Sequence, residues 1–140
     1  MEIITEDYVS FETAKLLKEK GFDENCAALY DLRNGEFHEK QTGYVFNNSQ
    51  WDNFITAPTL QMAKKWLRKV YNLFIEIQCY GCEYDEKAHF EYSYVISEYV
   101  KINTGDCTIF SLKKRNAKSQ FLSPEQACEA AIKYCLENLI

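Results

Sequence analysis

Three stretches of the chain place apolar residues three or four positions apart, the spacing of a helix that packs one face against a core. The first stretch follows Ser10, a residue type that caps helix N-termini, and it ends at Gly21, where a helix commonly stops. The second begins at Pro58, in the first turn of the expected helix, and the third begins at Ser123-Pro124. The pattern therefore predicts three helices.

Shorter apolar or alternating stretches predict five strands, over residues 27–32, 36–40, 73–80, 90–102 and 108–112. Asn34-Gly35 is typical of a tight hairpin turn, and the polar return strand after it is expected at a sheet edge. The last three strands are separated by polar turns over residues 81–87 and 103–106. They therefore indicate an antiparallel meander.

Two segments are predicted to be loops. Residues 41–53 lack any period, and we expect this loop to be held by its aromatic residues and the one after it, Tyr44, Phe46, Trp51 and Phe54. Residues 113–118 form a basic loop. The predicted order is α-β-β-α-β-β-β-α, without the strict β-α alternation of a parallel sheet. The expected fold is one globular α+β domain over residues 1–140, in which a meander and a β-hairpin pack with three helices.

The central helix is expected to divide into an apolar face and a basic face. The core face contains Met62, Ala63, Trp66, Leu67 and Val70. The opposite face contains Gln61, Lys64, Lys65, Arg68 and Lys69, and no acidic residue occurs between Asp52 and Glu76. We therefore predict Lys64, Lys65, Arg68 and Lys69 as a candidate interaction surface.

The last helix is expected to bury a stripe formed by Cys128, Ala131, Ile132, Cys135 and Leu139. In this interpretation both cysteines serve as small hydrophobic core residues. Glu129 and Lys133 are four positions apart, a spacing that allows an ion pair along the helix surface.

Composition and charge narrow the function classes. The net charge is −5, so bulk attraction to nucleic acid is not expected. The acidic start of the chain is unlike a signal peptide, and no apolar run approaches the length of a membrane span. We therefore expect a cytoplasmic protein that does not engage a membrane and whose cysteines are reduced. Ten tyrosines, several of them in the meander, suit a surface that binds another protein.

Cys79 and Cys82 form the single CxxC pair, which can bind zinc from a tight turn if His89 or Cys107 completes the site. A second pair at matching spacing is missing, so zinc is an alternative and we predict no cofactor. The acidic residues after Cys82 disfavour a redox dithiol, because they would raise a thiol pKa.

The chain contains no motif of a known enzyme class. We find no glycine-rich phosphate loop, no GxSxG and no HExxH. His38 lies on a polar strand, where we expect it to be solvated, and the sequence places no partner beside it or His89. We therefore predict a protein that is not an enzyme.

Three segments, SFETAKLLKEKGF (10–22), APTLQMAKKWLR (57–68) and EQACEAAIKYCLENLI (125–140), resemble a family of small uncharacterised proteins of bacteriophages, prophages and mobile elements of gut anaerobic bacteria. The segments cover about 40 of the 140 residues. The resemblance implies a small accessory protein made in a bacterial cytoplasm. It brings no catalytic or binding residues to this chain.

The leading hypothesis is a non-enzymatic accessory protein that binds another protein, with a homodimer as one form of this hypothesis. The alternative is a nucleic-acid-binding protein that uses Lys64, Lys65, Arg68 and the basic residues 113–118, together with stacking on aromatic strands. The net acidity disfavours this alternative.

Overall fold

The computed structural model describes residues 3–39, 45–49, 52–84, 86–101, 108–115 and 121–140. Its elements are α1 (Phe11–Glu19), β1 (Ala28–Asp31), β2 (Phe37–Glu39), β3 (Phe54–Thr56), α2 (Leu60–Tyr71), β4 (Leu73–Tyr84), β5 (Lys87–Lys101), β6 (Thr108–Arg115) and α3 (Pro124–Asn138). The predicted elements occur in the predicted order and form a single α+β domain, which confirms the fold class.

The helix caps follow from local chemistry. The Ser10 hydroxyl accepts a hydrogen bond from the backbone N–H of Thr13 at 3.2 Å, and Ser123 caps α3 in the same way. The prediction for the start of α2 is wrong by two residues. Pro58 was expected in the first turn, but α2 begins at Leu60, and the hydroxyl of the preceding residue, Thr59, accepts from the backbone N–H of Met62 at 3.2 Å.

A small antiparallel sheet has the strand order β2-β1-β3. Gly35 takes a positive φ of 73° in the turn between β1 and β2, and β2 is an exposed edge strand, as predicted. Strand β3 was not predicted, because its three residues are too few to show a period; it pairs Leu29 with Thr56. The expected loop anchors Tyr44 and Trp51 lie outside the described residues.

The larger sheet is the expected meander, with the order β4-β5-β6 and antiparallel pairing throughout. Two predicted boundaries are wrong. Residues 81–84 continue β4 and pair with β5, so the predicted turn over 81–87 is much shorter than expected. Lys113–Arg115 belong to β6, not to a loop, because β6 pairs with β5 as far as Arg115. The predicted turn over 103–106 and residues 116–118 lie outside the described residues.

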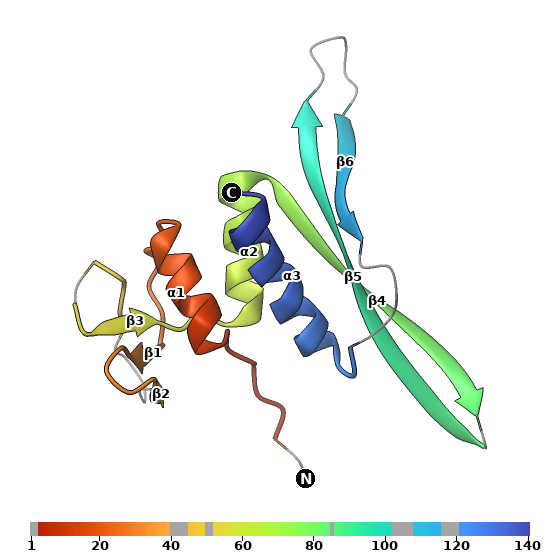
Figure 1. Cartoon of the computed structure of the whole chain (residues 1–140), viewed down its shortest axis with the longest axis horizontal. Helices are drawn as coiled ribbons and strands as arrows, with labels where there is room; N and C mark the ends of the chain where they lie inside the picture. Colours follow the sequence, from red (N-terminus) through yellow and green to blue (C-terminus); the bar gives the residue numbers. More distant parts are fainter. Residues whose placement is uncertain (1–2, 40–44, 50–51, 85, 102–107, 116–120) are drawn as a thin grey trace.

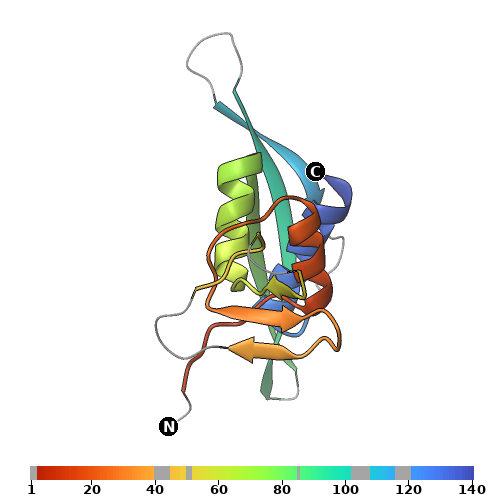
Figure 2. The ribbon, with the colours of Figure 1, turned by 90° about the vertical axis from the view of Figure 1, so that its left-hand side faces the viewer.

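All three helices lie on one side of the larger sheet, and the small sheet lies beyond them, next to α1 (Figure 1). Figure 2 shows the molecule from the side of the small sheet, with β1 and β2 in front of the helices. The core lies among the three helices and reaches both sheets, through Ile55 of β3 and Ile96 of β5. It includes Leu17, Phe22, Leu67, Ile96, Ile132 and Leu136.

The helix faces follow the sequence pattern with three corrections. Leu139 was expected in the buried stripe of α3, but it follows the last helical residue and is half-buried, and Leu136 is buried instead. Val70 was expected in the core, but its side chain is 54% exposed; the buried residues of α2 are Leu60, Ala63, Trp66 and Leu67. Glu129 was expected to pair with Lys133. Instead its carboxylate accepts from the Thr13 hydroxyl at 2.6 Å, whereas Lys133 pairs with Glu12 at 3.0 Å.

Candidate functional site

Helix α2 positions the candidate interaction residues. Its buried stripe faces the core, so Lys65, Arg68 and Lys69 are exposed and Lys64 is half-buried. We call these four residues the basic face of α2. None of them forms an ion pair with an acidic side chain in the described part of the chain. The basic face therefore presents positive charge that the described chain leaves unneutralised.

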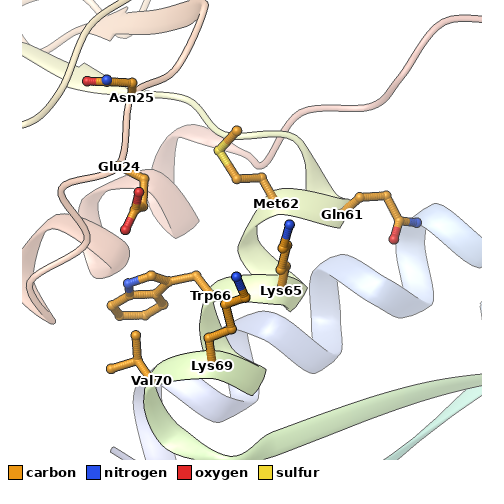
Figure 3. Close-up of a pocket in the computed structure, with 8 residues that line it drawn as sticks. All are labelled: Glu24, Asn25, Gln61, Met62, Lys65, Trp66, Lys69 and Val70. Carbon is orange, nitrogen blue, oxygen red and sulfur yellow. The ribbon is translucent and has the colours of Figure 1, made fainter.

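One side of the basic face borders an open pocket of about 460 Å³. We call it the Trp66 pocket; it is lined by Glu24, Asn25, Gln61, Met62, Lys65, Trp66, Lys69 and Val70. Figure 3 shows Glu24 and Asn25 on the segment after α1, across the pocket from the residues of α2. Apolar groups from Met62, Trp66 and Val70 thus meet the charged groups of Lys65 and Lys69.

The other side of the basic face borders a second hollow, of about 300 Å³. We call it the β4-edge groove; it is lined by Gln61, Lys64, Lys65, Arg68, Leu73, Phe74 and Ile75. It runs between α2 and the beginning of an edge strand of the larger sheet. Gln61 and Lys65 line both hollows, so the two share one wall.

The second basic cluster is not part of this surface. Lys113 pairs with Glu98 at 2.7 Å, and the Lys114 ammonium lies 5.2 Å from the centre of the Tyr134 ring. Both lysines are on β6, at the edge of the sheet opposite β4. The structure therefore does not join the two clusters into one continuous basic surface, and Lys118 lies outside the described residues. Nucleic-acid binding stays a prediction.

The tyrosines of the meander do not gather on one exposed surface. Tyr80 is 55% exposed and Tyr99 is 36% exposed, whereas Tyr94 is buried. Tyr80 pairs with Glu91 on β5, eight residues from Tyr99. The structure therefore gives no single tyrosine patch among these described residues, and binding to another protein stays a prediction.

Cys79 and Cys82 lie three residues apart on one continuous strand, not in a tight turn. Their cross-strand neighbours are Tyr92 and His89 respectively. Within the described residues there is no group of three or more His, Cys, Asp or Glu side chains that could hold a metal ion. Cys107 lies outside these residues, so the zinc alternative stays a prediction.

Among the cysteines whose side chains the structure describes, three are buried as free thiols: Cys26, Cys128 and Cys135. Burial raises the pKa of Cys26 and of Cys128 to about 11, and that of Cys135 to about 12. A buried thiol that stays protonated at neutral pH is a poor nucleophile. This confirms the expectation that Cys128 and Cys135 serve as core residues.

We expect the buried thiols to resist alkylation in the native protein at about pH 8, because the thiolate is the reactive form. A short iodoacetamide pulse followed by peptide mass spectrometry should find Cys79, which is exposed, labelled before the three buried thiols. Labelling of Cys135 at the rate of Cys79 would contradict this prediction.

The same shifts give a direction for stability against pH. Folding keeps these thiols neutral, so their contribution to the free energy of unfolding is fully present below the ordinary thiol pKa. This contribution is lost as the pH rises toward 11–12.

The histidines lie away from the basic face. His38 is on the edge strand β2, where its Nε2 lies 3.7 Å from a carboxylate oxygen of Glu36, and half of its side chain is exposed. His89 is exposed on β5.

Arg33 donates two side-chain hydrogen bonds, of 2.9 and 3.1 Å, to the Asp31 carboxylate, and this contact lowers the pKa of the Asp31 carboxyl.

The Trp66 pocket was not predicted from the sequence. Glu24 and Asn25 carry no motif. They face α2 because the residues around them contact that helix: Phe22 packs against Trp66, and the Cys26 thiol lies 3.8 Å from the Met62 sulfur. The exposed side chain of Val70 would have indicated the pocket, but the sequence pattern does not show that it is exposed. In a strict helical pattern Val70 continues the apolar stripe, and only the fold leaves it at the rim of the core.

No helix in the described part of the chain combines the length and the apolar character needed to cross a membrane. Comparisons with protein-family models, with curated proteins and with solved structures found nothing that matches this chain.

Proposed function

We propose that the chain is a non-enzymatic accessory protein that binds another protein through the Trp66 pocket and the adjoining basic face of α2. One observation carries the proposal: an open pocket of about 460 Å³ combines apolar side chains with cations that have no acidic partner among the described residues. Val70, an aliphatic residue, is 54% exposed at this pocket.

The pocket has the chemistry of a protein-binding hot spot. Trp and Met are enriched at such interfaces, and an apolar centre surrounded by charged groups is their usual arrangement. An apolar side chain of the partner would contact Met62, Trp66 and Val70, and acidic residues beside it would pair with Lys65 and Lys69. The expected partner therefore presents an apolar residue within an acidic surface.

The biological setting is part of the same proposal. Residues 10–22, 57–68 and 125–140 resemble accessory proteins of bacteriophages, prophages and mobile elements, so we place the interaction in the cytoplasm of a bacterial host. The second of these segments contains Met62, Lys65 and Trp66 of the pocket.

Site-specific photocrosslinking tests the proposal. A photoreactive residue replaces Val70 in one variant and Lys87 in a matched control; Lys87 is exposed at the start of β5, far from α2 (Figure 1). Irradiation in bacterial cells should give a crosslinked protein from position 70 that is missing from position 87.

The purified chain should then bind that protein, and the affinity should fall by about tenfold or more in Val70→Asp and in Lys69→Glu, as for hot-spot residues. Lys87→Glu should leave the affinity unchanged. The same products from both crosslinking positions, or an affinity that neither substitution alters, would reject the pocket as the binding site.

A further inference from the structure

The β4-edge groove lies beside an edge strand of the larger sheet. The backbone N–H of Tyr99 donates to the carbonyl of Asn72 at 3.0 Å, which makes residues 72 and 99 a hydrogen-bonded pair. Antiparallel pairing alternates, so the backbone groups of Ile75 and Ile77 point away from β5. In the described part of the chain no strand lies on that side of β4. An additional strand can therefore pair with β4 there.

Positive charge lines the same groove. Lys64, Lys65 and Arg68 form its α2 wall, and Leu73 and Ile75 belong to its β4 wall. An extended segment that carries both apolar and acidic side chains would complement these two walls. Such a segment would gain backbone hydrogen bonds from the strand edge and ion pairs from the helix.

The chain itself contains a segment with this chemistry. Residues 3–7, Ile-Ile-Thr-Glu-Asp, form an N-terminal arm without helix or strand, and it leaves the body of the molecule in both views (Figures 1 and 2). Ile3 is 83% exposed and Ile4 is 97% exposed. In an extended conformation Ile3 and Asp7 lie on one face of the arm, and Ile4 and Glu6 lie on the other. Either face therefore offers one aliphatic and one acidic side chain.

We infer that the arm of a second copy of this chain occupies the β4-edge groove, so that two copies exchange their arms. The arm is rooted where α2 begins, because the backbone N–H of Leu60 donates to the carbonyl of Asp7 at 2.9 Å. Residues 3–6 can extend about 13 Å from this point. A two-fold axis near the start of α2 brings each arm to the groove of the other copy, and the same contact forms twice.

This self-association goes beyond the proposed function, because Lys64, Arg68 and the β4 edge line only the groove. The two sites are nevertheless linked. Gln61 and Lys65 line both hollows, so an arm in the groove also shapes one wall of the Trp66 pocket.

Sedimentation equilibrium of the full chain tests the inference, from about 10 μM to about 1 mM, a range suited to weak association. A reducing agent excludes disulfide-linked dimers through the exposed Cys79. We expect a monomer–dimer equilibrium whose dissociation constant rises between about 0.05 M and about 0.5 M salt, because salt screens the ion pairs. In the dimer we expect Glu6 of each arm to pair with Arg68 of the other copy's groove. Arg68→Glu and Glu6→Lys should each raise the dissociation constant about tenfold, since this ion pair is formed twice. Lys87→Glu is the control and should leave it unchanged.

A mixture of the two variants gives the sharpest result. In a heterodimer, the unchanged arm of the Arg68→Glu variant meets the unchanged groove of the Glu6→Lys variant, which restores the pair of Glu6 with Arg68. The second contact pairs the new lysine at position 6 with the new glutamate at position 68. The mixture should therefore form heterodimers about as well as the original chain. A chain that stays monomeric at the highest concentration would overturn the inference, as would a dimer that neither substitution weakens or a mixture that does not recover. A monomer that still crosslinks its partner from position 70 would leave the proposed function standing.

Discussion

Replacing Trp66 with alanine is expected to lower the free energy of unfolding by about 3–5 kcal/mol. Trp66 is only 7% exposed, and its ring makes edge contacts with Phe22 at 5.4 Å and with Tyr71 at 5.3 Å between ring centres. Removing the indole would leave a cavity that α1, the segment after it and α2 cannot readily close. Urea unfolding followed by circular dichroism measures the loss.

Val70→Ala is the matched control on the same helix. Its side chain is 54% exposed, so we expect a loss below about 1 kcal/mol. A similarly small loss for Trp66→Ala would show that the indole is exposed in solution and that α2 is rotated from the orientation described above. Because Trp66 also lines the proposed binding pocket, partner affinity is measured only under conditions in which this variant is folded.

Replacing Glu129 with alanine is expected to lower the free energy of unfolding by about 2–3 kcal/mol, which is large for a single polar side chain. Its carboxylate oxygen accepts from the Thr13 hydroxyl at 2.6 Å and from the Ser10 backbone N–H at 3.0 Å. These bonds join the middle of α3 to the first turn of α1. The Thr13 side chain is buried, so without Glu129 its hydroxyl would keep only the Ser10 hydroxyl, 3.1 Å away, as a hydrogen-bonding partner.

Two further variants separate the causes. Glu129→Gln keeps an acceptor oxygen and should recover about half of the loss, because bonds to a neutral acceptor are weaker. Glu137→Ala, an exposed residue at the other end of α3, should change stability by less than about 0.5 kcal/mol. Equal losses from Glu129→Ala and Glu137→Ala in thermal or urea unfolding would argue against the bond to Thr13.

Local chemistry explains which predictions were confirmed. Ser10 and Ser123 cap helices because the hydroxyl group of each accepts a hydrogen bond from a backbone N–H only three residues later. Asn34-Gly35 forms its turn because Gly35 adopts a positive φ that other residues disfavour. Each of these features depends on a few neighbouring residues, so the sequence pattern was sufficient to find it.

The errors arose where a distant segment decides the outcome. Glu129 has a lysine four positions away, but its carboxylate bonds to Thr13 and Ser10, which come 116 and 119 positions earlier in the chain. The strand β3 exists because β1 supplies the pairing partner that three residues alone cannot indicate. Val70 continues the apolar pattern of α2, yet the neighbouring segments do not cover it.

The chain's own pattern was thus enough for the α+β class, the element order and the basic face of α2, because periodicity and capping act over a few residues. The arrangement of that face was decided only by tertiary packing. Folding places Glu24 and Asn25 opposite Trp66 and makes β4 an edge strand of the described sheet, beside Lys64 and Arg68. These contacts join segments far apart in the chain, so the spacing of residues within one segment cannot predict them.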